Sequence, residues 1–176
     1  FEAEKPVLTV GGTTVEARAL EYSAATPPEG VSGPLVAAPA DETPGCAAAD
    51  YDGLPVKGAV VLVDRGSCPF SEKQAIAAEK GAVAMVVANN ADEEMSGGTL
   101  GAVTEVKIPV VSVTKADGAR LRAKPGPTTL KLDAKTSSFT ARNVIAQTKT
   151  GLTNDVVMVG AHLDSVPEGP GINDNG

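Results

Sequence analysis

Apolar residues occur along the chain in short runs, and their spacing predicts strands more often than helices. In the first 37 residues, Val7–Val10 leads through Gly11 and Gly12 into the alternating segment 13–20. Two glycines between alternating segments are typical of a tight hairpin turn. The following segment 38–57 is rich in Pro, Ala and Asp and is predicted to be a loop.

The middle of the chain carries the clearest pattern. The continuous apolar runs 59–63 and 82–88 predict two buried strands. Ser71 and Gln74 form the pattern of a capping box, which predicts a helix starting at Ser71, and Gly81 is expected to end it. A strand, a helix and a strand in about thirty residues predict a parallel βαβ unit with a right-handed crossover.

Segment 89–106 is a predicted long polar loop, and we expect its glycine-rich part, 97–101, to be mobile. Three further elements are predicted after it: a strand at 108–113, a short helix begun by Thr114 with Asp117 and ending near Ala123, and a strand at 128–132.

The character of the sequence changes after Lys135. Segments 139–148 and 155–161 predict two strands of a hairpin, and residues 164–176 form a loop dense in Gly, Pro, Asn and Asp. We therefore predict one domain over residues 1–135 and part of a second over residues 136–176.

Composition narrows the classes of function. The net charge is −7, and phosphate binding needs clustered Lys and Arg, so no nucleic-acid partner is expected. No apolar run approaches the ~20 residues of a membrane helix, so no membrane-spanning segment is expected. The chain starts at Phe1 without a signal peptide and ends in Asn-Asp-Asn-Gly, which favours a fragment or a mature piece.

Cys46 and Cys68 are the two cysteines of the chain. They could be two buried free thiols, or they could form a disulfide, which would indicate an oxidising compartment. A disulfide would close a loop of about 23 residues and stabilise the fold by roughly 3 kcal/mol. The spacing fits neither a redox Cys-x-x-Cys pair nor, with two cysteines alone, a structural zinc site.

His162 is the single histidine and follows the apolar run Val156–Val159, a position where α/β sheets place ligands. Asp164 lies two residues further, on the same side of a strand, and could hold the His162 ring. Asp174 could share a divalent metal with His162, and this pair of donors suits zinc. A simple Asn-Gly turn and a calcium loop are the alternatives for segment 171–176.

Segment 57–70, with its Asp-Arg-Gly-x-Cys-x-Phe core, resembles the protease-associated (PA) domain, and Ile108–Val113 resembles it too. The resemblance covers roughly residues 5–135. It implies a strand-rich α/β fold: a β-barrel or sandwich with about two flanking helices.

Segments 157–166 and 169–176 resemble the opening of the catalytic domain of secreted bacterial di-zinc aminopeptidases, with glutamate carboxypeptidase and the transferrin receptor as more distant relatives. The resemblance implies that His162 binds one zinc, that Asp174 bridges two zincs, and that Asp164 orients His162. It also implies that the hairpin is a terminal piece of an α/β zinc-exopeptidase sheet.

The expected function is therefore that of a secreted or envelope-associated zinc aminopeptidase acting on peptide substrates. The general-base Glu and the remaining ligands of that family have no counterpart in these 176 residues. We expect this chain alone to be inactive and to need the rest of the catalytic domain as a partner. The alternative is a non-catalytic protein-interaction module with a degenerate peptidase remnant.

Overall fold

The computed structural model describes residues 1–101, 105–138, 140, 142–151 and 154–162. The chain divides into two compact units, Phe1–Ser138 and Phe139–Gly176. All assigned helices and strands of the described residues lie in the first unit.

The strands are β1 (Glu2–Ala3), β2 (Val7–Val10), β3 (Thr13–Val15), β4 (Arg18–Ala19), β5 (Val31–Ala37), β6 (Val60–Asp64), β7 (Ala84–Ala88), β8 (Val110–Val113), β9 (Pro127–Lys131) and β10 (Ala134–Lys135). The helices are the 3-10 turn η1 (Ala48–Tyr51), α1 (Phe70–Glu79) and α2 (Lys115–Ala123). Within the described ranges, no helix combines the length and the apolar character needed to cross a membrane.

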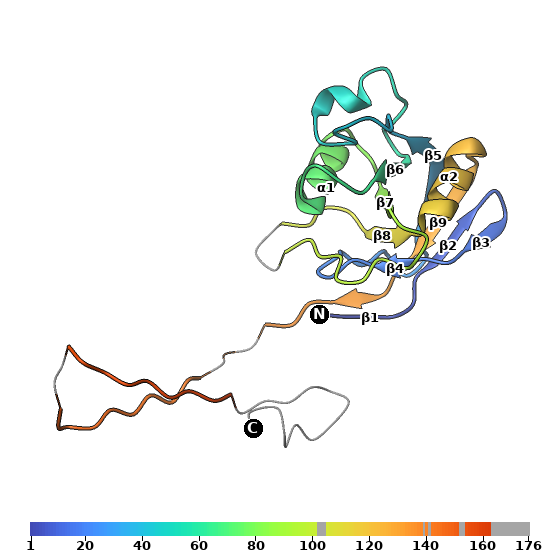
Figure 1. The fold of residues 1–176 in the computed structure, drawn as a ribbon. Helices are drawn as coiled ribbons and strands as arrows, with labels where there is room; N and C mark the ends of the chain where they lie inside the picture. Colours follow the sequence, from blue (N-terminus) through green and yellow to red (C-terminus); the bar gives the residue numbers. More distant parts are fainter. Residues whose placement is uncertain (102–104, 139, 141, 152–153, 163–176) are drawn as a thin grey trace. The chain divides into compact units, whose positions relative to one another are not determined.

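Eight strands form one curled sheet in the order β3-β2-β9-β5-β6-β7-β8-β4 (Figure 1). Strands β5, β6, β7 and β8 are parallel to one another, and the pairs toward both edges are antiparallel. Strands β1 and β10 form a separate antiparallel pair. The strand-rich α/β fold with two flanking helices is thus confirmed.

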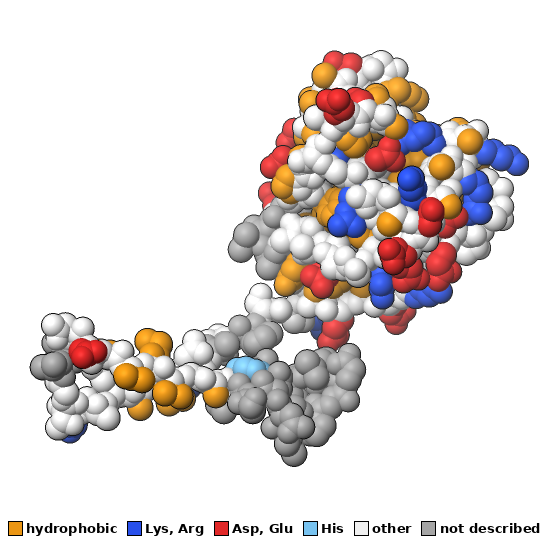
Figure 2. Space-filling model, viewed as in Figure 1, with side chains coloured by type: hydrophobic (Ala, Val, Ile, Leu, Met, Phe, Trp, Pro, Cys, Tyr) orange, Lys and Arg blue, Asp and Glu red, His pale blue; other side chains and the backbone are white. Residues whose placement is uncertain are grey.

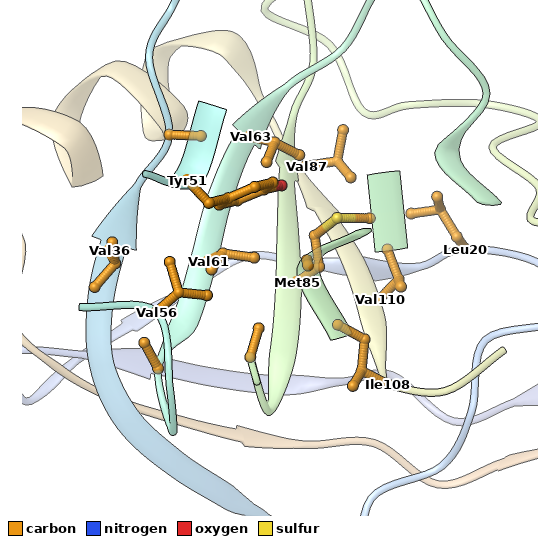
Figure 3. Packing of buried hydrophobic residues seen from close by; sticks show 14 of the residues in the cluster. Leu20, Val36, Tyr51, Val56, Val61, Val63, Met85, Val87, Ile108 and Val110 are labelled. Atoms are coloured by element: carbon orange, nitrogen blue, oxygen red, sulfur yellow. The ribbon is translucent and has the colours of Figure 1, made fainter. Parts of the chain in front are cut away.

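The predicted βαβ unit is present as β6, α1 and β7. Both strands are buried throughout their apolar residues, and successive side chains enter two different clusters. Val61, Met85 and Val87 belong to one cluster, which Figure 3 shows together with Tyr51. Val60 belongs to the other. Burial on both faces explains why these strands are continuous apolar runs instead of alternating ones.

The amino-terminal hairpin is confirmed, because Val10 faces Thr13 across Gly11 and Gly12, whose φ angles are 57° and 80°. The alternating segment 13–20 is not one strand, however. It breaks after β3, and β4 pairs with β8 at the opposite end of the strand order. Since only two residues separate β3 from β4, the two edges of the sheet must come close, which requires the sheet to curl.

The predicted caps of the two helices have different outcomes. Thr114 caps α2 as expected, and its side chain accepts a hydrogen bond from the Asp117 nitrogen at 3.1 Å. The predicted capping box of α1 is wrong, because the helix begins at Phe70 after Pro69 without a side-chain cap. Gln74 is fully buried and bonds to a distant backbone segment instead.

The predicted hairpin falls partly outside the described residues, which lack 139, 141 and 152–153. The described residues among 139–162 carry no assigned helix or strand. Five apolar side chains in it are at least 89% exposed: Val144, Ile145, Val157, Met158 and Val159. An isolated two-stranded hairpin is marginal in water, and a strand with such side chains needs a packed neighbour to become stable.

Candidate functional site

The predicted metal-binding residues are placed only in part. His162 lies in the second unit and is exposed, whereas Asp164 and Asp174 fall outside the described residues. Within the part of the chain that is described, no group of three or more His, Cys, Asp or Glu side chains could hold a metal ion. Imidazole and carboxylate are nevertheless the donor types that zinc binds, so the predicted pair fits zinc in its chemistry.

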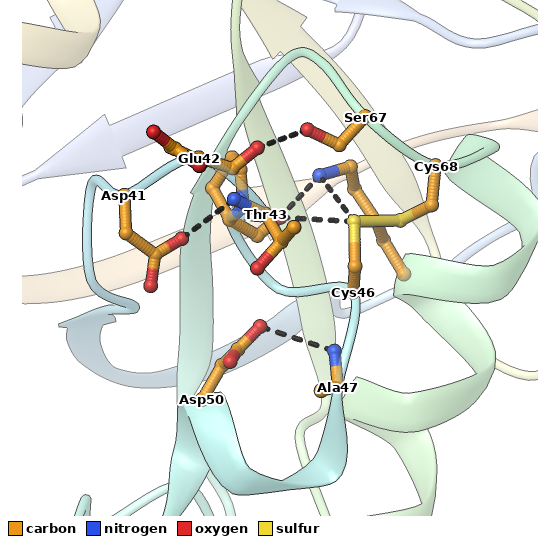
Figure 4. Close-up of a disulfide and its surroundings, with 10 residues drawn as sticks. Asp41, Glu42, Thr43, Cys46, Ala47, Asp50, Ser67 and Cys68 are labelled. Carbon is orange, nitrogen blue, oxygen red and sulfur yellow. Dashed lines mark hydrogen bonds between the residues drawn. A yellow bond between two sulfur atoms is a disulfide. The ribbon is translucent and has the colours of Figure 1, made fainter.

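Cys46 and Cys68 form a disulfide with a Cα–Cα distance of 5.9 Å, so the second of the two alternatives is correct (Figure 4). Neither cysteine is free. The bond joins the long loop before β6 to the turn between β6 and α1. It therefore fixes a loop that carries little regular structure of its own to the edge of the βαβ unit.

Lys73 lies beside this disulfide and is fully buried. Its Nζ atom donates a hydrogen bond to the Pro44 carbonyl and lies 3.5 Å from Cys46 Sγ. Burial lowers the pKa of Lys73, while the charges of nearby Asp side chains oppose that shift. The sequence analysis missed this residue, although its position four residues before the buried Ala77 places both on one helix face.

Tyr51, the last residue of η1, packs into the hydrophobic core from the loop that contains Cys46. It is 2% exposed, and its hydroxyl has no hydrogen-bond partner among the described residues. Burial, helped by the charge of Asp50, raises the pKa of Tyr51 to about 12. Gly45 leaves room for this ring, because a Cβ atom there would lie 2.8 Å from the Tyr51 hydroxyl and 2.9 Å from Val63 Cγ1.

The described part of the loop 89–106 is anchored at several points, in contrast to the expected mobile loop. Met95 and Leu100 are buried in the hydrophobic core. The Glu21 nitrogen donates to the Gly98 carbonyl at 2.9 Å, and the Leu100 nitrogen donates to the Glu21 carbonyl at 3.0 Å. The far end is fixed by Gln74, which bonds to the backbone of residues 105 and 107.

The polar residues at the carboxyl ends of β6 and β7 make structural contacts. Asp64 forms an ion pair with Arg122 of α2 at 2.9 Å. Arg65 Nη1 donates to Asn89 Oδ1 at 3.0 Å. These contacts hold the ends of β6 and β7 to each other and to α2. The side chains of Asp64 and Arg65 therefore have a structural role.

Glu94 of the acidic pair 93–94 forms an ion pair with Arg18 at 3.2 Å, and both side chains are more than half exposed. Figure 2 shows acidic and basic side chains interspersed on the visible face of the first unit. An exposed pair of this kind contributes little to stability.

Two families match this chain in succession. The PA domain matches residues 31–121, and peptidase family M28 matches residues 143–176. The first match includes the disulfide-bonded Cys46 and Cys68 together with β5 to α2, and the second includes His162, Asp164 and Asp174.

Curated relatives of the chain are aminopeptidases by name. It is 71% identical to the probable lipoprotein aminopeptidase LpqL of Mycobacterium tuberculosis over 176 residues, which are all of this chain and 35% of that protein. It is 41% identical to a probable leucine aminopeptidase 2 of Aspergillus oryzae over 180 residues, covering 96% of this chain and 34% of that protein. The chain thus spans about a third of the length of these relatives.

A solved structure supports the same relationship. The fold matches BSAP, a zinc aminopeptidase from Bacillus subtilis, with a TM-score of 0.63 and 30% identity over 74% of this chain and 30% of that one. The PA domain match alone extends over more than half of the residues, and it contains the four parallel strands β5 to β8 of the curled sheet together with α1 and most of α2. The chain therefore belongs to the PA domain family.

Proposed function

We propose that this chain is the PA domain and the opening catalytic segment of an extracytoplasmic zinc aminopeptidase, which releases amino-terminal residues from peptides. The observation that carries the proposal is the order of the two family matches, a PA domain followed directly by peptidase family M28. Relatives that cover nearly the whole chain carry aminopeptidase names, and one of them is named a lipoprotein. The disulfide is in keeping with an oxidising compartment.

Within the proposed catalytic segment, His162 and Asp174 would hold the zinc, His162 as a ligand of one ion and Asp174 as a ligand of both. Asp164 holds the other ring nitrogen of His162 and so fixes which nitrogen faces the metal. Zinc, when bound, lowers the pKa of a coordinated water and polarises the substrate carbonyl. A general base and the remaining ligands come from the rest of the catalytic domain.

The proposed division is a PA domain over residues 1–135 and a catalytic segment over residues 136–176. Two ligands leave half of a tetrahedral zinc shell without protein donors. On this basis the 176-residue chain by itself binds zinc weakly and does not hydrolyse peptides. The exposed apolar side chains of the second unit are in keeping with strands that become buried when the rest of the catalytic domain packs on them.

The PA domain has no catalytic group in this scheme and acts on substrate access or on protein contacts. Its loop 89–106 is the proposed contact, because Met95 and Leu100 hold it while Asp92, Glu93 and Thr99 are exposed. Anchored loops that present exposed polar side chains are common binding elements.

The experiment that tests the proposed function measures release of amino-terminal residues by the full-length protein. We expect activity that is lost on chelation, restored by zinc, and lost in the variant His162→Ala. Lys149→Ala, an exposed residue of the same unit, is the matched control and should keep full activity. An inactive full-length protein would favour the alternative, a non-catalytic interaction module.

A further inference from the structure

We propose that the Cys46–Cys68 disulfide is a site of directional thiol–disulfide exchange, in which Lys73 makes Cys46 the leaving sulfur. The reacting partner is a dithiol reductant. The observation behind the proposal is the contact between Lys73 Nζ and Cys46 Sγ at 3.5 Å. Among the hydrogen bonds of the described residues, none joins Lys73 to Cys68, so the ammonium distinguishes the two sulfurs.

The position of the ammonium is fixed by the fold. Lys73 of α1 is fully buried, and among the described residues its Nζ atom donates hydrogen bonds to the Pro44 carbonyl and to the Cys46 sulfur. A carbonyl carries no charge that could neutralise the ammonium. After reduction, the Cys46 sulfur can become a thiolate, whose negative charge would neutralise the Lys73 ammonium. Reduction therefore creates an ion pair between Lys73 and Cys46.

Three carboxylates also act on Lys73 through space, and they disfavour a nearby thiolate. They are Asp64 at the end of β6, Asp50 in η1 and Asp41 in the preceding loop. Each of them already accepts a hydrogen bond from another group: Arg122, the Ala47 nitrogen and the Thr43 nitrogen, respectively. Once the disulfide is reduced, the Cys46 sulfur is therefore the titratable group in direct contact with the ammonium.

The exchange step is the following. A thiolate of the reductant attacks Cys68 Sγ and forms a new sulfur–sulfur bond, while the Cys46–Cys68 bond breaks and its electron pair leaves with Cys46. The second thiol of the reductant then releases Cys68, so that the reductant is oxidised to a disulfide and the protein bridge is reduced. Exchange is faster when the leaving thiol has a low pKa, and a neighbouring ammonium lowers it.

The local exposure permits an attack on Cys68. This residue is half-buried, and its turn between β6 and α1 contains exposed Arg65, Ser67 and Pro69. Cys46 is half-buried as well, between the buried Gly45 and the exposed Ala47. The contact with Lys73, and not a difference in exposure, therefore distinguishes the two sulfurs.

The test uses the 176-residue chain and reduced glutathione as the probe. The mixed disulfide is trapped by acid and located by peptide mass spectrometry. We expect the adduct on Cys68, and we expect Lys73→Met to slow the exchange by roughly 3- to 10-fold and to remove the preference. Lys80→Met is the matched control, because Lys80 is the C-cap residue of the same helix and pairs with Asp52. An adduct mainly on Cys46, or an equal effect of Lys80→Met, would overturn the proposal.

A second measurement leaves Lys73 in place and so does not depend on the folding of its variant. Cys68→Ser leaves the Cys46 thiol, and Cys46→Ser leaves the Cys68 thiol. The rate of alkylation by iodoacetamide against pH gives the pKa of each. We expect the Cys46 thiol to titrate below the ordinary value of about 8.5 and below the Cys68 thiol; the reverse order would contradict the proposal.

Discussion

Gln74 Oε1 accepts a hydrogen bond from the backbone nitrogen of Lys107 at 3.1 Å, although the two residues are 33 positions apart in the chain. The same amide donates through Nε2 to the Glu105 carbonyl, also at 3.1 Å. One buried side chain of α1 therefore satisfies two backbone groups at the end of the loop 89–106. The helix holds the loop in place through hydrogen bonds that an apolar residue could not make.

Replacing Gln74 by Leu should destabilise the first unit by about 1–3 kcal/mol, because two hydrogen bonds between the buried side chain and the backbone of Glu105 and Lys107 are lost. Urea unfolding measures the change, and amide hydrogen exchange at Lys107 should accelerate with it. Glu72→Ala, an exposed position of the same helix, is the control and should change stability by less than about 0.5 kcal/mol. Equal free energies of unfolding for the two variants would show that the hydrogen bonds from Gln74 to the loop make no net contribution to stability.

Replacing Gly45 by Ala should cost about 2–3 kcal/mol, since the residue has φ 70° and the new Cβ would meet the Tyr51 hydroxyl. Gly53→Ala is the matched control, because Gly53 has φ 77° but no atom within 4 Å of its added Cβ. It should cost about 1 kcal/mol. The double variant Gly45→Ala, Tyr51→Phe should recover part of the difference, and failure to recover any would assign the clash to Val63.

Stability of the wild-type chain should fall between pH 10 and pH 12 because of Tyr51. Burial raises the pKa of Tyr51 to about 12, so the unfolded chain ionises first as the pH rises and the folded state loses its advantage. The loss attributable to this group is about 2–3 kcal/mol. Tyr51→Phe should flatten the decline measured by urea unfolding across this range. Parallel declines in wild type and Tyr51→Phe would contradict the assignment.

Removing charge from the exposed part of the loop 89–106 tests the proposed role of the PA domain. The full-length variant Asp92→Ala, Glu93→Ala keeps the anchors Met95 and Leu100, so the loop remains packed. We expect the ratio of kcat/KM for long peptides to that for dipeptides to change by at least about threefold, which corresponds to roughly 0.7 kcal/mol of transition-state binding. Glu29→Ala serves as an acidic control elsewhere on the domain, and an unchanged ratio would remove the loop from substrate selection.

Much of the fold follows from local patterns. The runs that became β6 and β7 are apolar at every position because both faces of these strands are buried. The Gly11-Gly12 turn and the Thr114 cap are equally local, since each depends on residues no more than three positions apart. Such features are legible in the sequence because neighbouring residues determine them.

The remainder depends on contacts between distant segments. Ser71 and Gln74 have the spacing of a capping box, yet Gln74 serves the backbone 33 residues further on. Segment 13–20 alternates like one strand but is divided between the two edges of a curled sheet. A lysine is usually exposed to solvent, but Lys73 is fully buried. Its ammonium donates hydrogen bonds to a carbonyl and a sulfur of the loop before β6, which the local sequence does not reveal.

The proposed metal site depends on sequence and family alone. His162 is exposed in the second unit, and the roles of His162, Asp164 and Asp174 stay predictions. In the proposed enzyme, their contacts would involve residues that these 176 do not include. No local pattern could therefore supply the geometry of the complete site.

Metal content of the full-length protein tests the central claim most directly. The account predicts about two zinc ions per chain, measured by inductively coupled plasma mass spectrometry after exhaustive dialysis. It also predicts loss of zinc in His162→Ala and in Asp174→Ala, with Lys149→Ala unchanged. A folded full-length protein without stoichiometric zinc, or one that keeps its zinc in both ligand variants, would contradict the account.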